Sequence, residues 1–448
     1  MILANGLAEL GMPSMPLNIS TLDADFEAVF TALLNSKRED NADVTATVMG
    51  IINDVATRGD EAVLELTQKF DGLAVERMDE LRLHAADLAA AYGRISPELS
   101  ASLHLAADRI RGFHERQLPS DISYVDDAGV RLGLRHTAVD AAGLYVPGGK
   151  AAYPSSVLMN AMPAVVAGVE RLVMVVPTPM ASTGGKPSDM VLAAAHIAGI
   201  SEVWTIGGAQ AVAALAYGTE SIQAVDKIVG PGNAFVAAAK RQVFGKVGID
   251  SIAGPSEILI MADADNNPDW VAMDLLSQAE HDEAAQSILI SDNAEFSAAV
   301  ASSVARILPT LARADIAGAS WRDHGAIITV QSWDEGAALA NRIAAEHLEI
   351  ATAAPHDLAA NIRHAGAIFI GRWTPEAIGD YVAGPNHVLP TARTSRFSSG
   401  LGVLDFMKRT TMVECDQSSL NVIGPAAVCL ADAEGLEAHG LSVSQRLE

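Results

Sequence analysis

Residues 203–211 read Val-Trp-Thr-Ile-Gly-Gly-Ala-Gln-Ala, which is a short apolar run, a pair of glycines and the start of an alanine-rich segment. The same order of features recurs around three other stretches, Gly143–Gly149, Arg171–Pro177 and Lys227–Asn233. Short β-rich runs that alternate with longer helices are typical of parallel strands joined by right-handed crossovers. The sequence therefore predicts an α/β fold, with a Rossmann-like domain over residues 136–256.

A second series of the same design begins at the apolar run Ile258–Met261. Later strands are expected at residues 288–290, 326–330, 347–351 and 367–370, with helical segments between them. The polar stretch Gly379–His387 is expected to form a loop after a strand, where such sheets usually carry functional side chains.

The rest of the chain has a different texture. From Asp23 to Arg116, apolar residues recur at helical spacing and show no chemistry. The last fifty-odd residues are rich in Ser, Arg and Gly at first and helical at the end, which is typical of an arm. The predicted division is a leader (1–20), a first α/β domain (21–135 and 257–390), a second, Rossmann-like domain (136–256) and a C-terminal arm (391–448).

Composition limits the class of protein. The 448 residues carry a formal net charge of −25, which argues against nucleic acid or an anionic membrane as a partner. The longest apolar run, at residues 157–169, is too short to span a bilayer, and the N-terminus has no cationic signal region. The two cysteines, Cys415 and Cys429, have no CxxC spacing, which fits a reducing compartment. We expect a cytoplasmic protein.

One helix carries candidate metal ligands. It is expected to begin at Asn267-Pro268-Asp269, because Asn suits the cap, Pro the first helical position and Asp the first turn. Asp274, Gln278 and His281 follow at positions i, i+4 and i+7, so they share one face. An amide oxygen and an imidazole on one face can bind a metal. The alternative is a solvated polar face at the end of an apolar helix.

Two further features have functional and structural interpretations. Glu346 and His347 lie where a helix gives way to a strand, and titratable groups beside buried sequence are costly unless they are used or paired. They form a candidate acid and base, or His347 is a helix-terminal histidine. The turn that begins Gly230-x-Gly232-x-x-Phe235 lacks the third glycine of a dinucleotide fingerprint. It therefore indicates either a nicotinamide-cofactor site or ordinary turn glycines.

Taken together, these segments resemble the histidinol dehydrogenase family, whose members catalyse the last two oxidations of histidine biosynthesis. The resemblance covers residues 22–448. It is carried by long strings: GLYVPGG at 143–149, YPSSVLMNAMPA at 153–164, GGAQA at 207–211, VGPGNAFV at 229–236, AGPSE at 253–257, QAEHD at 278–282, AAEHLEI at 344–350 and GDYVAGPNHVLPT at 379–391.

The resemblance implies two incomplete Rossmann-like, aldehyde-dehydrogenase-like domains, zinc and NAD as cofactors, and roles for individual residues. The implied zinc ligands, a nitrogen and oxygen set that zinc accepts, are Gln278, His281, Asp380 and His439. The implied catalytic acid and base are Glu346 and His347. The zinc ligands and His347 also contact the substrate in the family, as do Ser256 and Glu434. The implied dinucleotide contacts are Tyr145, Gln210 and Asn233. Asp274 gains no role.

The implied reaction is the four-electron oxidation of L-histidinol to L-histidine through L-histidinaldehyde, in a homodimer whose arm supplies His439 to the partner's site. The closest alternative is a zinc- and NAD-dependent dehydrogenase of another small alcohol, such as a sulfonated diol. That enzyme should lack Glu434 or His439, and this chain has both. A zinc hydrolase is disfavoured because no H-E-x-x-H occurs, and an inactive metal-binding regulator because Glu346 and His347 are present.

Overall fold

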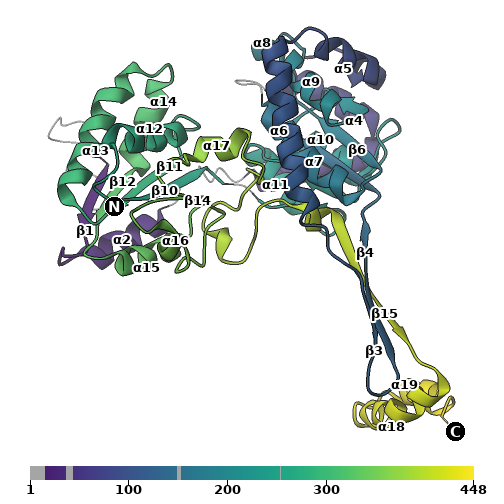
Figure 1. Ribbon diagram of the computed structural model, residues 1–448. Helices are drawn as coiled ribbons and strands as arrows, with labels where there is room; N and C mark the ends of the chain where they lie inside the picture. Colours follow the sequence, from purple (N-terminus) through teal and green to yellow (C-terminus); the bar gives the residue numbers. More distant parts are fainter. Residues whose placement is uncertain (1–15, 37–43, 149–152, 253, 448) are drawn as a thin grey trace.

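The computed structural model describes residues 16–36, 44–148, 153–252 and 254–447. Two α/β bodies lie side by side, and an extended arm leaves one of them (Figure 1). Each body is built on a six-stranded sheet, here called sheet I and sheet II, with strand orders β1-β12-β11-β10-β13-β14 and β2-β7-β6-β5-β8-β9. The predicted fold class, α/β with two Rossmann-like sheets and a helical C-terminal arm, is confirmed.

Sheet II contains the strands predicted from the glycine turns. Its strands are Arg82–Leu83 (β2), Ala141–Tyr145 (β5), Arg171–Val175 (β6), Glu202–Trp204 (β7), Lys227–Val229 (β8) and Gly248–Ile249 (β9). All pairs except β2 with β7 are parallel. Successive side chains of β5 enter opposite cores, because Ala142 and Leu144 pack in one cluster while Ala141 and Tyr145 pack in the other. Both faces are therefore buried, as parallel sheets require.

Helices cover both faces of sheet II. They are Thr45–Arg58 (α3), Asp60–Asp71 (α4), Ala85–Tyr92 (α5), Pro97–Glu115 (α6), Pro154–Ala167 (α7), Met180–Thr183 (α8), Asp189–Ile197 (α9), Gly208–Tyr217 (α10) and Ala234–Val243 (α11). Helices α3 to α6 pack against α10, α9 and α7. This differs from the predicted assignment of residues 21–135 to the first domain. The physical reason is that β2, within this segment, pairs with β7 and ties the helices to sheet II.

Sheet I is entirely parallel. Its strands are Leu17–Ser20 (β1), Glu257–Ala262 (β10), Gln286–Ser291 (β11), Ala326–Thr329 (β12), His347–Ala351 (β13) and Ala367–Ile370 (β14). β1 corrects the predicted leader: Ile19 is buried, and residues 17–20 pair with β12. Residues 1–15 of that leader lie outside the described residues.

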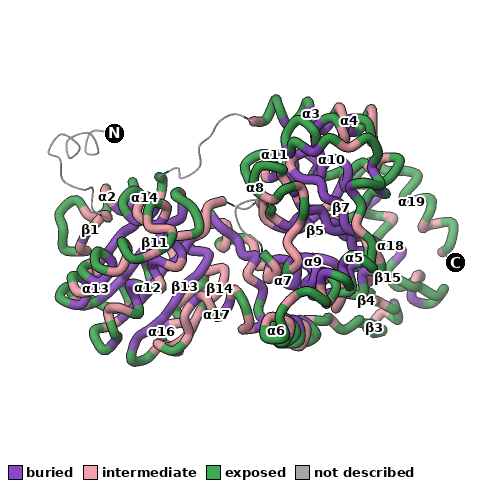
Figure 2. The backbone as a smooth tube through the Cα atoms, turned by 90° about the horizontal axis from the view of Figure 1, so that it is seen from above, coloured by how far each residue is buried: buried purple, intermediate pink, exposed green. Residues whose placement is uncertain are grey.

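The helices of sheet I include the one singled out above. They are Phe26–Asn35 (α2), Pro268–Ala279 (α12), Ala294–Ile307 (α13), Ala314–His324 (α14), Trp333–Ile343 (α15), Pro355–Ala359 (α16) and Glu376–Tyr381 (α17). The predicted start of α12 is confirmed, because the Asn267 side chain accepts a hydrogen bond from the Asp269 N–H at 2.9 Å and Pro268 is the first helical residue. Buried residues fill the two bodies (Figure 2), and each sheet has one apolar cluster on either face.

The arm is an antiparallel ribbon that carries two helices at its far end (Figure 1). Its elements are Ile122–Val125 (β3), Arg131–Ala138 (β4), Met407–Glu414 (β15), Gln417–Ala433 (α18) and Glu437–Ser444 (α19). β15 pairs with β4 along eight residues, so the arm also contains a segment predicted to belong to the first domain. Among the described residues, no helix is both long enough and apolar enough to cross a membrane.

Candidate active site

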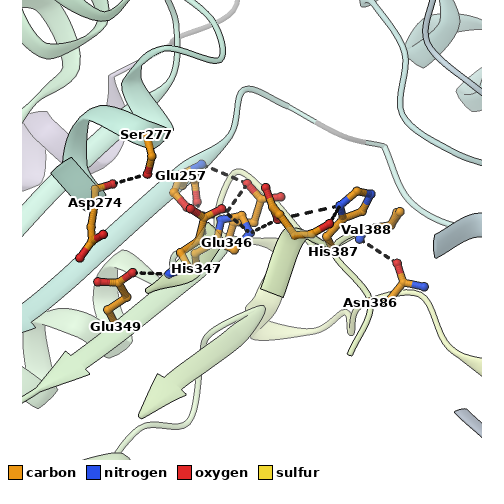
Figure 3. Close-up of polar contacts among 11 residues, drawn as sticks. Glu257, Asp274, Ser277, Glu346, His347, Glu349, Asn386, His387 and Val388 are labelled. Carbon is orange, nitrogen blue, oxygen red and sulfur yellow. Dashed lines mark hydrogen bonds and ion pairs between the residues drawn. The ribbon is translucent and has the colours of Figure 1, made fainter. Parts of the chain in front are cut away.

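Glu346 and His347 lie at the amino-terminal edge of sheet I. His347 is the first residue of β13 and pairs with Ile258, next to Glu257 at the start of β10. The Glu346 carboxylate accepts a hydrogen bond from the Glu257 N–H at 3.0 Å, and the Glu257 carboxylate accepts one from the Glu346 N–H at 3.2 Å. These reciprocal bonds join the two strand starts and fix the position of Glu346 (Figure 3).

His347 has one ring nitrogen engaged and the other available. Its Nδ1–H donates to the Glu257 carbonyl at 3.0 Å, which places the lone pair on Nε2. Nε2 has no hydrogen-bond partner among the described residues. The nearest carboxylate atoms are Glu376 Oε1 at 3.7 Å and Asp380 Oδ1 at 3.9 Å. Burial lowers the pKa of His347 to about 4, so the ring is neutral and can accept a proton.

Glu346 is a buried carboxyl in an acidic surrounding. Burial raises its pKa well above the ordinary range, and the charges of Glu257, Asp380 and Glu376 raise it further. A carboxylate with a raised pKa is a stronger proton acceptor than an exposed one. The interpretation of Glu346 and His347 as a buried acid–base pair therefore has a geometric basis, since both side chains are at least nine-tenths buried.

Asp380 lies in a helix that ends at Tyr381, so the predicted loop over Gly379–His387 is corrected for residues 379–381 and confirmed for residues 382–387. The short helix α17 follows Pro375, and its first N–H, that of Glu376, donates to the buried Glu349 carboxylate at 2.5 Å. This cap starts a helix where glycine spacing alone indicates a loop. One turn later α17 presents Asp380 toward His347. Burial and, next to it, the charge of Asp380 raise the pKa of Glu376 to about 9.

Helix α12 brings Gln278 to the same edge. Gln278 is fully buried, and neither its Oε1 nor its Nε2 has a hydrogen-bond partner in the described part of the chain. A buried amide left in that state costs free energy, so a missing partner is indicated. His281 lies just past the helix end; burial lowers the pKa of His347 and of His387, and the charge of the nearby His281 adds to this effect.

Asp274 faces a different partner. Its carboxyl lies close enough to that of Glu349 for the two to influence each other, and burial raises the pKa of Asp274 to about 6. The predicted grouping of Asp274 with Gln278 and His281 on one helix face therefore does not hold as a single site, because Asp274 is paired with Glu349.

The residues at this edge offer a set of metal ligands. One ligand atom from each of His347, Glu376 and Asp380 lies within 4.8 Å of the others. Gln278 adds an unpartnered amide oxygen. Nitrogen and oxygen donors in this arrangement suit zinc. The donors present therefore fit a metal ion, although which of them bind it stays a prediction.

Glu434 and His439 do not join this group within one chain. They belong to the α18–α19 end of the arm, where they line a pocket of about 390 Å³. That end is far from α12 and α17 (Figure 1).

The predicted dinucleotide residues lie at the carboxyl-terminal edge of sheet II. Tyr145 ends β5, and its hydroxyl accepts a hydrogen bond from the Gly208 N–H at 3.0 Å, at the start of α10. Gln210 is buried in the first turn of α10. Asn233 caps α11, because its side chain accepts from the Phe235 and Val236 N–H groups. Two helix N-termini at this edge suit the negative phosphates of a dinucleotide.

The glycines between these elements are required by packing. A Cβ on Gly207 would lie 2.2 Å from Pro177, and one on Gly230 would lie 2.1 Å from the Tyr145 carbonyl oxygen. The turns after β5, β6, β7 and β8 therefore approach one another more closely than side chains allow. Packing alone therefore explains why these turn positions are glycine. This explanation does not conflict with a ligand bound above the turns.

The two edges meet. His387 is partly buried and its Nδ1 lies 3.1 Å from the Asp380 carbonyl oxygen, while Ser156 Oγ of α7 lies 3.4 Å from its Nε2. The Asn386 side chain donates to the Met159 carbonyl of α7 at 2.6 Å. The start of α7, which follows β5 of sheet II, therefore touches the sheet I site. Ser256, the predicted substrate contact, is partly exposed just before β10.

Three site residues were missed by the sequence reasoning: Glu257, Glu376 and His387. Glu257 and His387 lie inside strings that carry the family resemblance, AGPSE and GDYVAGPNHVLPT, and this position was the available signal. Glu376 lies outside those strings, and no sequence pattern marks it.

Two sheet edges in contact, one with a buried histidine and possible metal donors and the other with two helix N-termini, are compatible with an oxidoreductase of the alcohol and aldehyde dehydrogenase type. The family model for histidinol dehydrogenase matches residues 34–447. This chain belongs to the histidinol dehydrogenase family.

Similarity to individual proteins of this family supports the assignment. The histidinol dehydrogenase of Ruegeria pomeroyi is 62% identical over 434 residues, 97% of this chain and 99% of that protein. The histidinol dehydrogenase of Rhodospirillum rubrum is 63% identical, with the same shares covered. The crystal structure of histidinol dehydrogenase from Elizabethkingia anophelis superposes with a TM-score of 0.91 at 32% identity, covering 97% of this chain and 98% of that one.

Proposed function

We propose that this protein oxidises L-histidinol to L-histidine through L-histidinaldehyde, the last two steps of histidine biosynthesis, with NAD+ as the oxidant. The observation that carries the proposal is the buried Glu346–His347 pair in a chain of this family, with His347 Nε2 unpartnered at the described site. The N-termini of α10 and α11, which both lie at the carboxyl-terminal edge of sheet II, support a dinucleotide at that edge.

We propose that zinc is held by Gln278, His281 and Asp380, together with His439 of the partner subunit. The unpartnered amide of Gln278 and the carboxylate of Asp380 support this set. Bound zinc would orient the amine and imidazole nitrogens of the substrate and so raise the effective concentration of its reacting carbon.

The first oxidation needs a base for the alcohol proton. His347 Nε2 takes that proton, since its ring is neutral and its Nδ1–H is fixed on the Glu257 carbonyl. NAD+ accepts one hydride in each of the two oxidations. Ser256 and Glu434 of the partner subunit are proposed to bind the substrate, while Tyr145, Gln210 and Asn233 are proposed to bind the dinucleotide.

The second oxidation needs water. The aldehyde must add water before a second hydride leaves, and Glu346 takes a proton from that water. Only the ionised form of Glu346 can take this proton, and its raised pKa makes that form a stronger acceptor. His347 then acts again as the base. The two residues thus divide the work, although both lie at the start of one strand.

The test of the function is NADH formation with two substrates. With L-histidinol, the protein should form two NADH for each substrate consumed and yield L-histidine. With a sulfonated diol, the substrate of the alternative dehydrogenase, it should form none above background. Turnover of the diol in preference to histidinol would establish the alternative and overturn the proposal.

We also propose a homodimer with shared active sites. Glu434 and His439 lie at the far end of an arm whose elements are largely exposed, including the large apolar side chains Ile122, Tyr124, Val413, Val422 and Leu430. Such a surface favours a protein partner. In a twofold dimer each chain gives and receives the same element, so both sites become complete.

Mixed dimers test the sharing. When His347→Ala and His439→Ala subunits are unfolded together and refolded, half of the dimers formed at random are mixed. Each mixed dimer has one intact site and one doubly altered site, so about a quarter of wild-type activity should return. The matched control mixes His347→Ala with His281→Ala, whose altered residues belong to the same body, and no activity should return. Mixed dimers without recovered activity would rule out sharing.

We propose a cytoplasmic location, on the basis of the two cysteines. Both cysteines, Cys415 and Cys429, are free and exposed, which fits a reducing compartment. Fractionation of cells that produce the protein, with activity measured in each fraction, tests this location.

A further inference from the structure

A buried ion pair lies directly beneath the turn after β8. Lys240 of α11 and Asp250, which follows β9, have side chains that are 3% and 4% exposed, and their charged groups are in contact. Lys240 Nζ also donates to the Gly230 carbonyl at 2.9 Å, and the Asp250 carboxylate accepts from the Gly230 N–H at 2.8 Å. Both peptide groups of one glycine are therefore held by one charge pair.

The local sequence explains this placement. Asp250 continues β9, and its own N–H donates to the Ile228 carbonyl, so its side chain reaches the end of β8. Lys240 lies on the buried face of α11, between Val236 and Val243. The strand end and the helix thus converge on Gly230 from two sides.

The other side of Gly230 is closed by backbone. Gly230 has a φ of +110°, and a Cβ there would lie 2.1 Å from the Tyr145 carbonyl oxygen. The peptide is thus pressed against β5 on one side and held by Lys240 and Asp250 on the other. Three residues later Asn233 caps α11. The position of the whole Gly230–Asn233 turn follows from these contacts.

The energetics point to a role other than stability. Removing two charges from water costs several kcal/mol for each ion, and well-packed apolar residues are often as stabilising. Sheet II already has two apolar cores. The burial of this ion pair against one glycine is therefore better explained by the need to fix the turn than by a contribution to overall stability.

We propose that Lys240 and Asp250 are positioning residues for the dinucleotide, because they fix the Gly230–Asn233 turn and the N-terminus of α11 in the conformation that binds it. This inference rests on the proposed NAD+ site. The pair touches neither the substrate nor the proposed zinc ligands, so its effect is confined to the dinucleotide.

The experiment compares the Lys240→Met/Asp250→Leu double variant with wild type. Replacing both charges together leaves no unpaired buried ion, so the variant should fold. The KM for NAD+ should rise about tenfold or more, which corresponds to about 1.4 kcal/mol. The kcat at saturating NAD+, the KM for histidinol and the zinc content should stay within about twofold of wild type, because those depend on sheet I.

A matched control lies at the opposite edge of the same sheet. Arg171 pairs with Glu202 at 3.0 Å and donates to the Gln223 and Ala224 carbonyls, so it holds a loop in the same manner away from the proposed site. Arg171→Met should lower the melting temperature and leave the KM for NAD+ unchanged. A purely structural role for the Lys240–Asp250 pair predicts the same behaviour for both variants.

Two further readings complete the test. Lys240→Arg keeps the charge and the N–H donors, so its affinity for NAD+, measured by calorimetry, should stay close to that of wild type. If the double variant does not fold, Lys240→Arg is compared with Asp250→Asn, which should bind NAD+ more weakly. An unchanged KM for NAD+ in folded double variant would overturn the inference. Failure of the wild type to reduce NAD+ with histidinol would instead overturn the proposed function, so the two failures are distinguishable.

Discussion

Sheet I and sheet II share one design but use opposite edges. In sheet II, the predicted dinucleotide residues Tyr145 and Asn233 follow the strands, at the carboxyl-terminal edge where ligands of open α/β sheets usually bind. In sheet I, Glu346 and His347 precede β13, at the amino-terminal edge. This agrees with the expectation that Glu346 and His347 lie where a helix gives way to a strand, whereas Asp380 comes from the segment after β14.

The difference follows from what each edge provides. At a carboxyl-terminal edge the crossover helices begin, so sheet II offers backbone N–H groups and glycine turns. At an amino-terminal edge those helices end, so α12 delivers Gln278 there, and α17 returns to place Asp380 beside His347. Sheet I therefore contributes buried side chains that titrate and are proposed to bind metal, and sheet II contributes glycine turns and helix N-termini for the proposed dinucleotide. Substitutions at the two edges should affect different kinetic constants.

The largest effect is expected from losing the metal at the sheet I edge. Chelation followed by dialysis should reduce histidinol oxidation to background, and added zinc should restore it, because the buried amide of Gln278 and the carboxylate of Asp380 then regain a partner. His281→Ala should lose bound zinc, measured by atomic absorption. Apoprotein that oxidises histidinol at the untreated rate would show that the metal assignment is wrong.

The next effect is expected at His347. His347→Ala removes the proposed base of both oxidations, so kcat should fall by about 10² to 10⁴, the range typical of general base catalysis. The KM for NAD+ should change little, because sheet II is untouched. His136→Ala is a control, since His136 lies in β4 of the arm. A His347→Ala enzyme with unimpaired kcat would refute the role of the base.

Glu346→Gln should separate the two half-reactions. Only the second requires addition of water, so aldehyde oxidation should fall more than alcohol oxidation. The amide keeps an oxygen that accepts from the Glu257 N–H, so the fold around it should persist. Supplying the aldehyde directly measures the second half-reaction alone. Equal losses in both half-reactions would contradict the division of labour.

Gly230→Ala tests the backbone edge. The added Cβ would meet the Tyr145 carbonyl oxygen at 2.1 Å, and the positive φ adds strain of about 1–3 kcal/mol. The KM for NAD+ should rise while kcat at saturating NAD+ is retained. Gly199→Ala is the matched control, because Gly199 also has a positive φ but has open space around it. An equal rise in KM in both variants would show that general strain, and not the turn, is responsible.

Much of this comparison could be predicted from the sequence, because local signals decide local structure. The Asn267 cap fixes the start of α12, and the apolar run after Glu346 predicts β13 with its observed bounds. Periodicity shows that a helix has a buried face, but it does not show which sheet covers that face. Residues 45–115 were therefore assigned to the wrong sheet. Glu376 was missed because its role depends on the distant Glu349 and His347.

The smallest effect concerns a buried carboxyl of sheet II that has no proposed chemistry. Asp71, at the end of α4, is 8% exposed, and its Oδ2 has no hydrogen-bond partner among the residues that the structure describes. Burial raises its pKa to about 6, from 3.8. If sheet I reserves its shifted carboxyls for catalysis, this one should affect stability alone.

The sign follows from proton linkage. The folded protein holds the Asp71 proton more tightly than the unfolded chain, so the stability present below pH 3.8 is lost as pH rises through about 6. Asp71→Asn cannot ionise, so it should be the more stable protein at pH 7, by up to about 3 kcal/mol, and should gain little at pH 4. Urea unfolding at both pH values measures this difference. Glu61→Gln, which removes an exposed carboxylate from the same helix, is the control. An Asp71→Asn protein whose advantage is the same at pH 4 and pH 7 would show that the buried charge is not its cause.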